Sequence, residues 1–85
     1  MSKREKIIAR LLERPKDFTY AELEVLFNLL GYEEVKTGKT SGSRRAFISL
    51  SKKHIIRLHK PHPGSELRLY QIDYIIQELK KENLL

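Results

Sequence analysis

Hydrophobic residues recur every three or four positions in three segments of the chain, which is the spacing that places them on one face of a helix. The positions are Ile7, Ile8, Leu11 and Leu12 in the first segment, Leu23, Leu26, Phe27 and Leu30 in the second, and Leu69, Ile72, Ile76 and Leu79 in the third. This pattern predicts two short helices near the N-terminus and one helix near the C-terminus.

Residues that cap or break helices set the ends of the first two. The segments 2–5 (Ser-Lys-Arg-Glu) and 19–22 (Thr-Tyr-Ala-Glu) are capping-box patterns, in which a hydroxyl and a Glu side chain bind otherwise unsatisfied N–H groups. Pro15 is expected to end the first helix, because proline lacks an N–H and restricts the residue before it. Gly31 is placed to end the second helix in a left-handed cap.

Between the second and third helices the pattern changes to that of strands. Segments 32–36, 44–50 and 54–60 are separated by a loop of Gly, Ser and Thr at 37–42 and by a turn at 51–53. Two prolines and a glycine exclude regular structure at 61–64. We therefore expect a single α+β domain over residues 1–85, with the order α-α-β-β-β-α and the helices on one face of a three-stranded antiparallel sheet.

The third strand alternates in a way that distinguishes its two faces. Ile56 and Leu58 alternate with Arg57 and His59, so one face is suited to burial and the other presents a cation and an imidazole.

The second strand is ambiguous, because Phe47 and Ile48 are adjacent and point in opposite directions. If Phe47 faces the helices, Arg44, Ala46 and Ile48 line the exposed face beside the cation and imidazole of the third strand.

The basic residues gather in this predicted sheet. Residues 35–65 hold eight Lys or Arg and no Asp or Glu, whereas the other 54 residues hold nine Lys or Arg and eleven Asp or Glu. A cationic surface without acids attracts phosphate, so an RNA or DNA backbone is the expected partner. A solubilising charged face is the alternative interpretation. A membrane surface is not expected, since no amphipathic helix is both basic and aromatic.

The chain has no cysteine and no apolar run longer than three residues. We therefore expect no disulfide scaffold, no thiolate metal site and no membrane span. We expect a cytoplasmic location. The three histidines, His54, His59 and His62, match no strong metal-ligand spacing, so we expect neither a metal nor another cofactor. Metal-free RNA cleavage instead needs a base, an acid and cations for the developing charge, which His and Arg supply.

Two motifs, Gly-Ser-Arg-Arg-x-Phe at 42–47 and Leu-His-Lys-Pro-His-Pro at 58–63, are followed by a helix. In these motifs and their order the chain resembles the HicA family of toxins. The resemblance implies a double-stranded-RNA-binding-domain-like α-β-β-β-α core over 19–85, with 2–14 as an added helix. It also implies an mRNA interferase of a type II toxin–antitoxin system and a HicB-type antitoxin that covers the active face.

One departure from the family pattern concerns catalysis. The position after Gly-Ser, a histidine in the family, is Arg44 here. Arginine stays protonated and cannot act as a general base, although it can hold a phosphate through two hydrogen bonds. We therefore expect His59 to act as base or acid, with Arg44 and Arg57 stabilising the phosphorane. His62 matches the Pro-His-Pro motif, and its alternative role is to tie down the loop.

Further assignments complete the predicted site. His54 is expected to be solvated, and Tyr70 and Tyr74 are expected to lie at the edge of the core rather than stack on bases.

Two other functional classes remain open, a non-catalytic RNA-binding module of the same fold and a protein-interaction domain whose basic face receives an acidic partner. The predicted phosphate contacts are Lys36, Lys39, Arg44, Arg45, Arg57 and Lys60.

Overall fold

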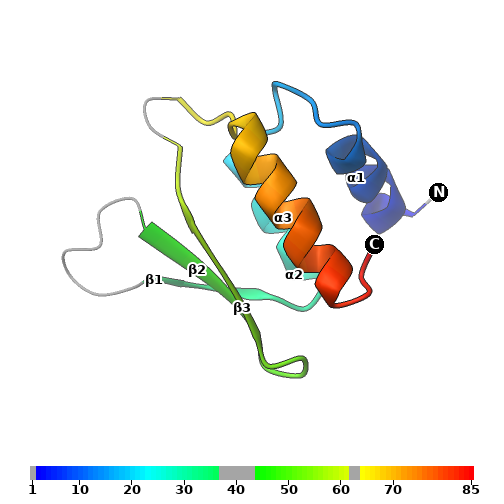
Figure 1. The fold of residues 1–85 in the computed structure, drawn as a ribbon, viewed down its shortest axis with the longest axis vertical. Helices are drawn as coiled ribbons and strands as arrows, with labels where there is room; N and C mark the ends of the chain where they lie inside the picture. The colour runs from blue at the N-terminus through cyan, green and yellow to red at the C-terminus, as the bar shows by residue number, and fades with distance from the viewer. Residues whose placement is uncertain (1, 37–43, 62–63) are drawn as a thin grey trace.

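The structure is a computed structural model that describes residues 2–36, 44–61 and 64–85. The described helices are α1 (Lys3–Leu12), α2 (Tyr20–Leu29) and α3 (Leu69–Lys81), and the described strands are β1 (Glu33–Lys36), β2 (Arg44–Ser49) and β3 (His54–His59). This order confirms the α-α-β-β-β-α prediction, and each strand is one residue shorter than expected. Figure 1 shows the three helices together on one side of the sheet.

The predicted N-terminal caps are present. The Ser2 hydroxyl accepts a hydrogen bond from the backbone N–H of Glu5, at 3.2 Å. Thr19 and Glu22 form the full capping box, since each side chain binds the backbone N–H of the other. These bonds satisfy N–H groups that have no partner within the helix.

The C-terminal end of α2 also follows the prediction. Gly31 has φ +89°, in the left-handed region. The backbone N–H groups of Gly31 and Tyr32 donate to the carbonyls of Asn28 and Phe27, at 3.2 and 2.8 Å. This is the bonding pattern of a Schellman motif, which turns the chain directly into β1.

Helix α1 is joined to both other helices. Leu11 is fully buried in the core. On the surface, the Nε atom of Arg10 lies 2.6 Å from a Glu22 carboxylate oxygen on α2, and Arg14 binds both oxygens of Asp73 on α3, at 2.7 and 3.0 Å. Because exposed ion pairs contribute little, the main stabilising contact of α1 is the packing of Leu11 and of two partly buried isoleucines against the core.

The register of the sheet decides the orientation of β2. The strands are antiparallel in the order β1-β2-β3, and Phe47 pairs with Ile56. Phe47 is 1% exposed, so it faces the helices. Since neighbouring residues alternate, Arg44, Ala46 and Ile48 lie on the outer face, the sheet face that points away from the helices.

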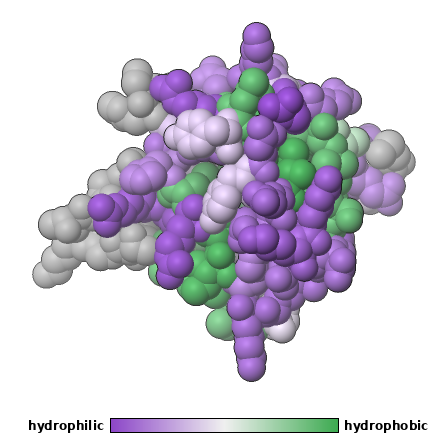
Figure 2. Space-filling model, in the orientation of Figure 1, coloured by the Kyte–Doolittle hydropathy of each residue, from purple (hydrophilic) through white to green (hydrophobic). Residues whose placement is uncertain are grey.

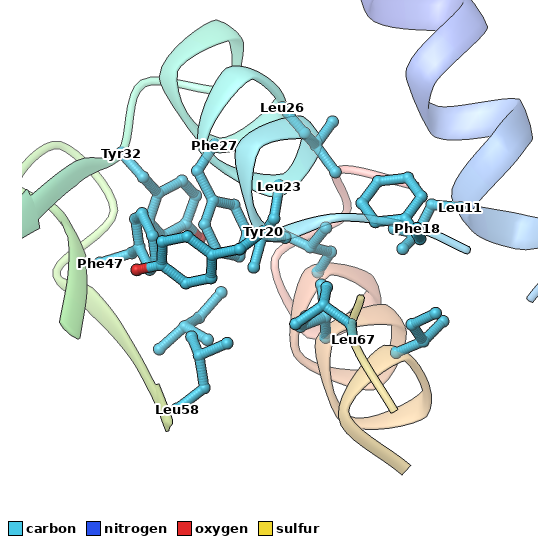
Figure 3. Close-up of a cluster of buried hydrophobic side chains, with 14 of the residues drawn as sticks. Leu11, Phe18, Tyr20, Leu23, Leu26, Phe27, Tyr32, Phe47, Leu58 and Leu67 are labelled. Carbon is cyan, nitrogen blue, oxygen red and sulfur yellow. The ribbon is translucent and has the colours of Figure 1, made fainter. Parts of the chain in front are cut away.

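A single core lies between the sheet and the helices (Figure 3). The Phe27 ring of α2 lies 5.3 Å from that of Tyr32 and 4.5 Å from that of Phe47, centroid to centroid, which joins α2 to the sheet. No helix among the described residues is long and apolar enough to cross a membrane. The buried core residues are Leu11, Phe18, Tyr20, Leu23, Leu26, Phe27, Leu30, Tyr32, Phe47, Ile56, Leu58, Leu67, Ile72, Ile75 and Leu79.

Candidate nucleic-acid interface

Three predicted site residues meet at one end of the outer face. Arg44 of β2 and His59 of β3 are directly paired across the sheet, and Arg57 pairs with Ala46 two residues further along β3. Arg44, Arg57 and His59 are exposed. Opposite residues of an antiparallel pair have Cβ atoms about 5 Å apart, so the guanidinium of Arg44 and the imidazole of His59 can act on one ligand.

This end of the sheet is hollowed. A hollow of about 350 Å³, which we call the cationic hollow, is lined by Arg44, Arg45, Arg57, Leu58 and His59. Ala46 is 3% exposed although it lies on the outer face, because it occupies the central strand between Val35 and Arg57. The small alanine leaves room above the sheet for the longer side chains beside it.

The rest of the outer face carries apolar side chains and one acid. Val35, which pairs with Ala46, and Ile55 are exposed, and Ile48 is half-buried. The exposed Glu33 pairs with Ile48, so the outer face has a cationic end and an apolar area with an acidic residue beside it. Hydrophilic residues cover most of the view in Figure 2, and hydrophobic residues show in smaller patches between them.

Arg45 and Lys60 are positioned differently from the other predicted phosphate contacts. Arg45 pairs with the inward-facing Leu58, and its Nε lies 3.6 Å from an oxygen of Glu34. The Lys60 ammonium lies 5.4 Å from the centroid of the Tyr20 ring on α2. Both cations thus lie toward the helices, although Arg45 still lines the cationic hollow.

Glu34 offsets the charge of these two cations. Burial favours the neutral form of its carboxyl group, but the hydrogen bond from the Tyr20 hydroxyl and the charges of Arg45 and Lys60 lower its pKa overall. Burial and the neighbouring carboxylate raise the pKa of Tyr20. Near neutral pH, Glu34 is therefore ionised and accepts a hydrogen bond from Tyr20, and its negative charge offsets that of Arg45 and Lys60 on the helix-facing side of the sheet.

Of the remaining predicted site residues, one lies in β1 and two lie outside the described residues. Lys36 pairs with Arg45 in the β1–β2 register. Lys39 and His62 lie outside the described residues.

His54 is not solvated, so the expectation for this residue was wrong. Its side chain is 13% exposed. Its Nδ1 lies 2.6 Å from the Tyr32 hydroxyl, and its Nε2 lies 3.1 Å from a carboxylate oxygen of Glu78 on α3. Strand alternation explains the result, because His54 has the same parity as the buried Ile56.

Sequence reasoning missed Gln71, which fixes the end of β3. Its Nε2 donates to the backbone carbonyl of His59 at 2.9 Å, and its Oε1 accepts from the backbone N–H of Arg68 at 3.0 Å. Gln71 is 6% exposed. The N-cap residue of α3 is Arg68, so the sequence carries only the Gln half of a capping-box signal, which does not by itself predict this contact.

The two tyrosines of α3 differ. Tyr74 packs against the core as expected, but Tyr70 is 68% exposed, so the expectation fails for Tyr70. Among the described residues, no three His, Asp or Glu side chains come together in a way that could hold a metal ion.

Three comparisons, with protein-family models, curated proteins and solved structures, found no match to this chain. The resemblance to HicA toxins therefore rests on the two sequence motifs and on the order of the elements.

Proposed function

We propose that this protein is the RNA-cleaving toxin of a type II toxin–antitoxin pair, an mRNA interferase that works without a metal ion. The observation that carries the proposal is the direct pairing of Arg44 with His59 across two strands, with Arg57 on the same face. A base or acid and two cations thereby line one hollow. These are the groups that metal-free cleavage of a phosphodiester needs.

The chemistry follows from these groups. The ribose 2′-oxygen attacks the adjacent phosphorus, and the bond from phosphorus to the 5′-oxygen breaks. Either His59 accepts the proton of the 2′-hydroxyl while water protonates the leaving 5′-oxygen, or His59 protonates the 5′-oxygen while water accepts the proton of the 2′-hydroxyl. Arg44 and Arg57 stabilise the charge of the phosphorane. The products are a 2′,3′-cyclic phosphate and a free 5′-hydroxyl.

Arg44 acts in this mechanism as a cation and not as a base. Its planar guanidinium can donate two parallel hydrogen bonds to phosphate oxygens, which a lysine cannot do. The family's histidine role thus moves to His59, its neighbour across the sheet.

A non-catalytic RNA-binding module is the second candidate. One observation favours it: among the described residues His59 is the only histidine on the outer face, since His54 faces the helices. General acid–base cleavage is fastest with two proton-transfer groups. A module with one imidazole and several cations would hold RNA and leave it intact.

The proposal includes a HicB-type antitoxin that covers the outer face. The apolar area of Val35, Ile48 and Ile55 supports protein binding, because apolar area rimmed by charged residues is typical of a protein interface. If the protein were only an interaction domain, an acidic protein would bind this face and RNA would not. Co-purification with the neighbouring gene product tests the antitoxin part.

The test is a titration of a labelled RNA with the protein in EDTA, which measures binding. Gel analysis of the same samples then measures cleavage. A parallel RNA with a single 2′-deoxy position at the mapped cleavage site serves as the matched control. Cleavage of the all-ribose RNA, with none at the deoxy position, is the expected result. Binding without cleavage of either RNA favours the non-catalytic module, and no binding contradicts both.

A further inference from the structure

Tyr70, the second residue of α3, is a large aromatic side chain with 68% of its surface exposed. Its helical neighbour Tyr74, one turn later, is packed against the core. The core therefore does not account for the position of the Tyr70 ring. Exposed aromatic rings beside cations are the surfaces on which proteins stack unpaired nucleobases.

Two more hollows follow the cationic hollow in a row, and each shares lining residues with the one before it. The first, of about 330 Å³, lies between β3 and α3, and we call it the tyrosine hollow. It shares Arg57, Leu58 and His59 with the cationic hollow, and Tyr70, Gln71 and Tyr74 form its other wall. Its volume falls within the range of sites that hold small organic groups, about 300–1,000 Å³.

The second, of about 590 Å³, lies at the N-terminal end of α3 and shares Tyr70 with the tyrosine hollow. Lys16 and Arg68 supply cations there, and Glu66 is the acidic residue in its lining. The three hollows therefore form a series in which cations lie on both sides of an aromatic ring.

Gln71 links β3 and α3, the two elements that line the tyrosine hollow. Its amide binds the His59 carbonyl on one side and the Arg68 N–H on the other, at 2.9 and 3.0 Å. These two bonds fix the distance between the end of β3 and the start of α3. The backbone of Tyr70, the preceding residue, is thereby fixed near the end of β3, so that Tyr70 and His59 line one hollow before any ligand binds, which reduces the entropy cost of binding.

We propose that the tyrosine hollow binds one unpaired nucleobase, stacked on Tyr70, and that the substrate is consequently single-stranded RNA. The phosphate on one side of that base lies in the cationic hollow, and the backbone on the other side passes Arg68 and Lys16. A base within a duplex is already stacked and paired, so it cannot enter the hollow without an unstacking cost. This inference rests on the proposed RNA binding and adds the strandedness of the substrate.

The test compares a single-stranded RNA with a duplex of the same sequence, using the wild type, Tyr70→Leu and Tyr70→Phe. Leucine keeps the apolar bulk and removes the aromatic face, whereas phenylalanine keeps the face. Stacking contributions predict that Tyr70→Leu binds the single strand about five-fold to a hundred-fold more weakly. Tyr70→Phe restores that affinity, and duplex binding is unchanged in both.

A second readout separates stacking from affinity. At saturating protein, a 2-aminopurine in the single strand loses fluorescence when it stacks on Tyr70, and Tyr70→Leu restores the emission. Equal binding of single strand and duplex, together with no effect of Tyr70→Leu, overturns the inference and leaves the proposed function standing. If the wild type binds neither RNA, the proposed function fails and the inference fails with it.

Discussion

The two ends of β3 each carry a histidine, and the two imidazoles have opposite surroundings. At one end, His54 faces the helices and is held between Tyr32 and Glu78. At the other, His59 lies on the outer face, opposite Arg44. The two positions are five residues apart, an odd number, which places them on opposite faces of the strand. Residue type alone therefore does not identify a histidine that can meet a ligand, because strand parity decides whether its imidazole faces the helices or the outer face.

The same contrast applies to cations at the two ends of the sheet. Arg44→Ala removes the proposed phosphate ligand at the His59 end, so the cleavage rate should fall by about 10²–10³, the usual cost of losing one donor to the transition state. Lys52→Ala removes an exposed charge from the turn before His54 and should leave the rate nearly unchanged. Single-turnover kinetics on a short RNA measures both.

Arg44→Lys sharpens this prediction, because it keeps the charge and loses the planar fork. It should recover only a small part of the lost rate. Full recovery would mean that Arg44 contributes charge alone, and an equal effect of Lys52→Ala would contradict the assignment of the site to the His59 end.

At the His54 end we expect a change in stability. His54→Ala leaves the Tyr32 hydroxyl and the Glu78 carboxylate without their shared partner, so the free energy of unfolding should fall by about 1–3 kcal/mol. His59→Ala, at an exposed position, should change it by less than about 0.5 kcal/mol. Urea titrations followed by circular dichroism give both values, and a larger loss for His59→Ala would reverse the comparison.

Acid should weaken the same contacts. The hydrogen bond from Lys81 lowers the pKa of Glu78 below its ordinary value of 4.5, against the effect of burial, and His54 lowers it further. A depressed folded pKa stabilises the protein above the unfolded value, and this contribution is lost as the pH falls through the folded value.

The stability difference between the wild type and Glu78→Gln should therefore be largest near neutral pH and should shrink below about pH 4.5. Urea titrations of both proteins between about pH 7 and about pH 3 measure it. A difference that grows toward acid would show that Glu78 has the opposite shift.

The smallest expected effect concerns binding. Each phosphate contact contributes about −0.7 to the slope of log affinity against log salt for a single strand. Arg57→Gln should reduce the magnitude of that slope by about this amount, and Lys52→Gln should leave it unchanged. Fluorescence anisotropy at several salt concentrations distinguishes them, and equal slopes for Arg57→Gln and the wild type would place the RNA elsewhere.

The ends of the helices were predictable because their signals are local. Thr19 and Glu22 cap α2 from three residues apart, and Gly31 ends it through bonds within one turn. The orientation of β2 could not be predicted in this way, because Phe47 and Ile48 are both apolar and either could face the helices. The pairing of Phe47 with the buried Ile56 across the sheet decides between them.

The cationic site was predicted in part. Arg44, Arg57 and His59 meet as alternation indicated once Phe47 faces inward. By the same alternation, Lys60 shares a face with the buried Leu58, and Arg45 shares one with the buried Phe47. The helix-facing positions of Lys60, Arg45 and His54 could therefore have been predicted from the sequence. The contact of Gln71 with the His59 carbonyl links two elements through a loop, and no local pattern predicts that distance.

The most direct measurement is the cleavage of a long mRNA in EDTA by the wild type, His59→Ala and His54→Ala, at a temperature where all three are folded. We expect the wild type and His54→Ala to cut the RNA, and His59→Ala to be slower by about 10²–10⁴-fold, the range for losing a general acid or base. Full activity in His59→Ala, or loss of activity in folded His54→Ala, would contradict the assignment of the catalytic end of β3.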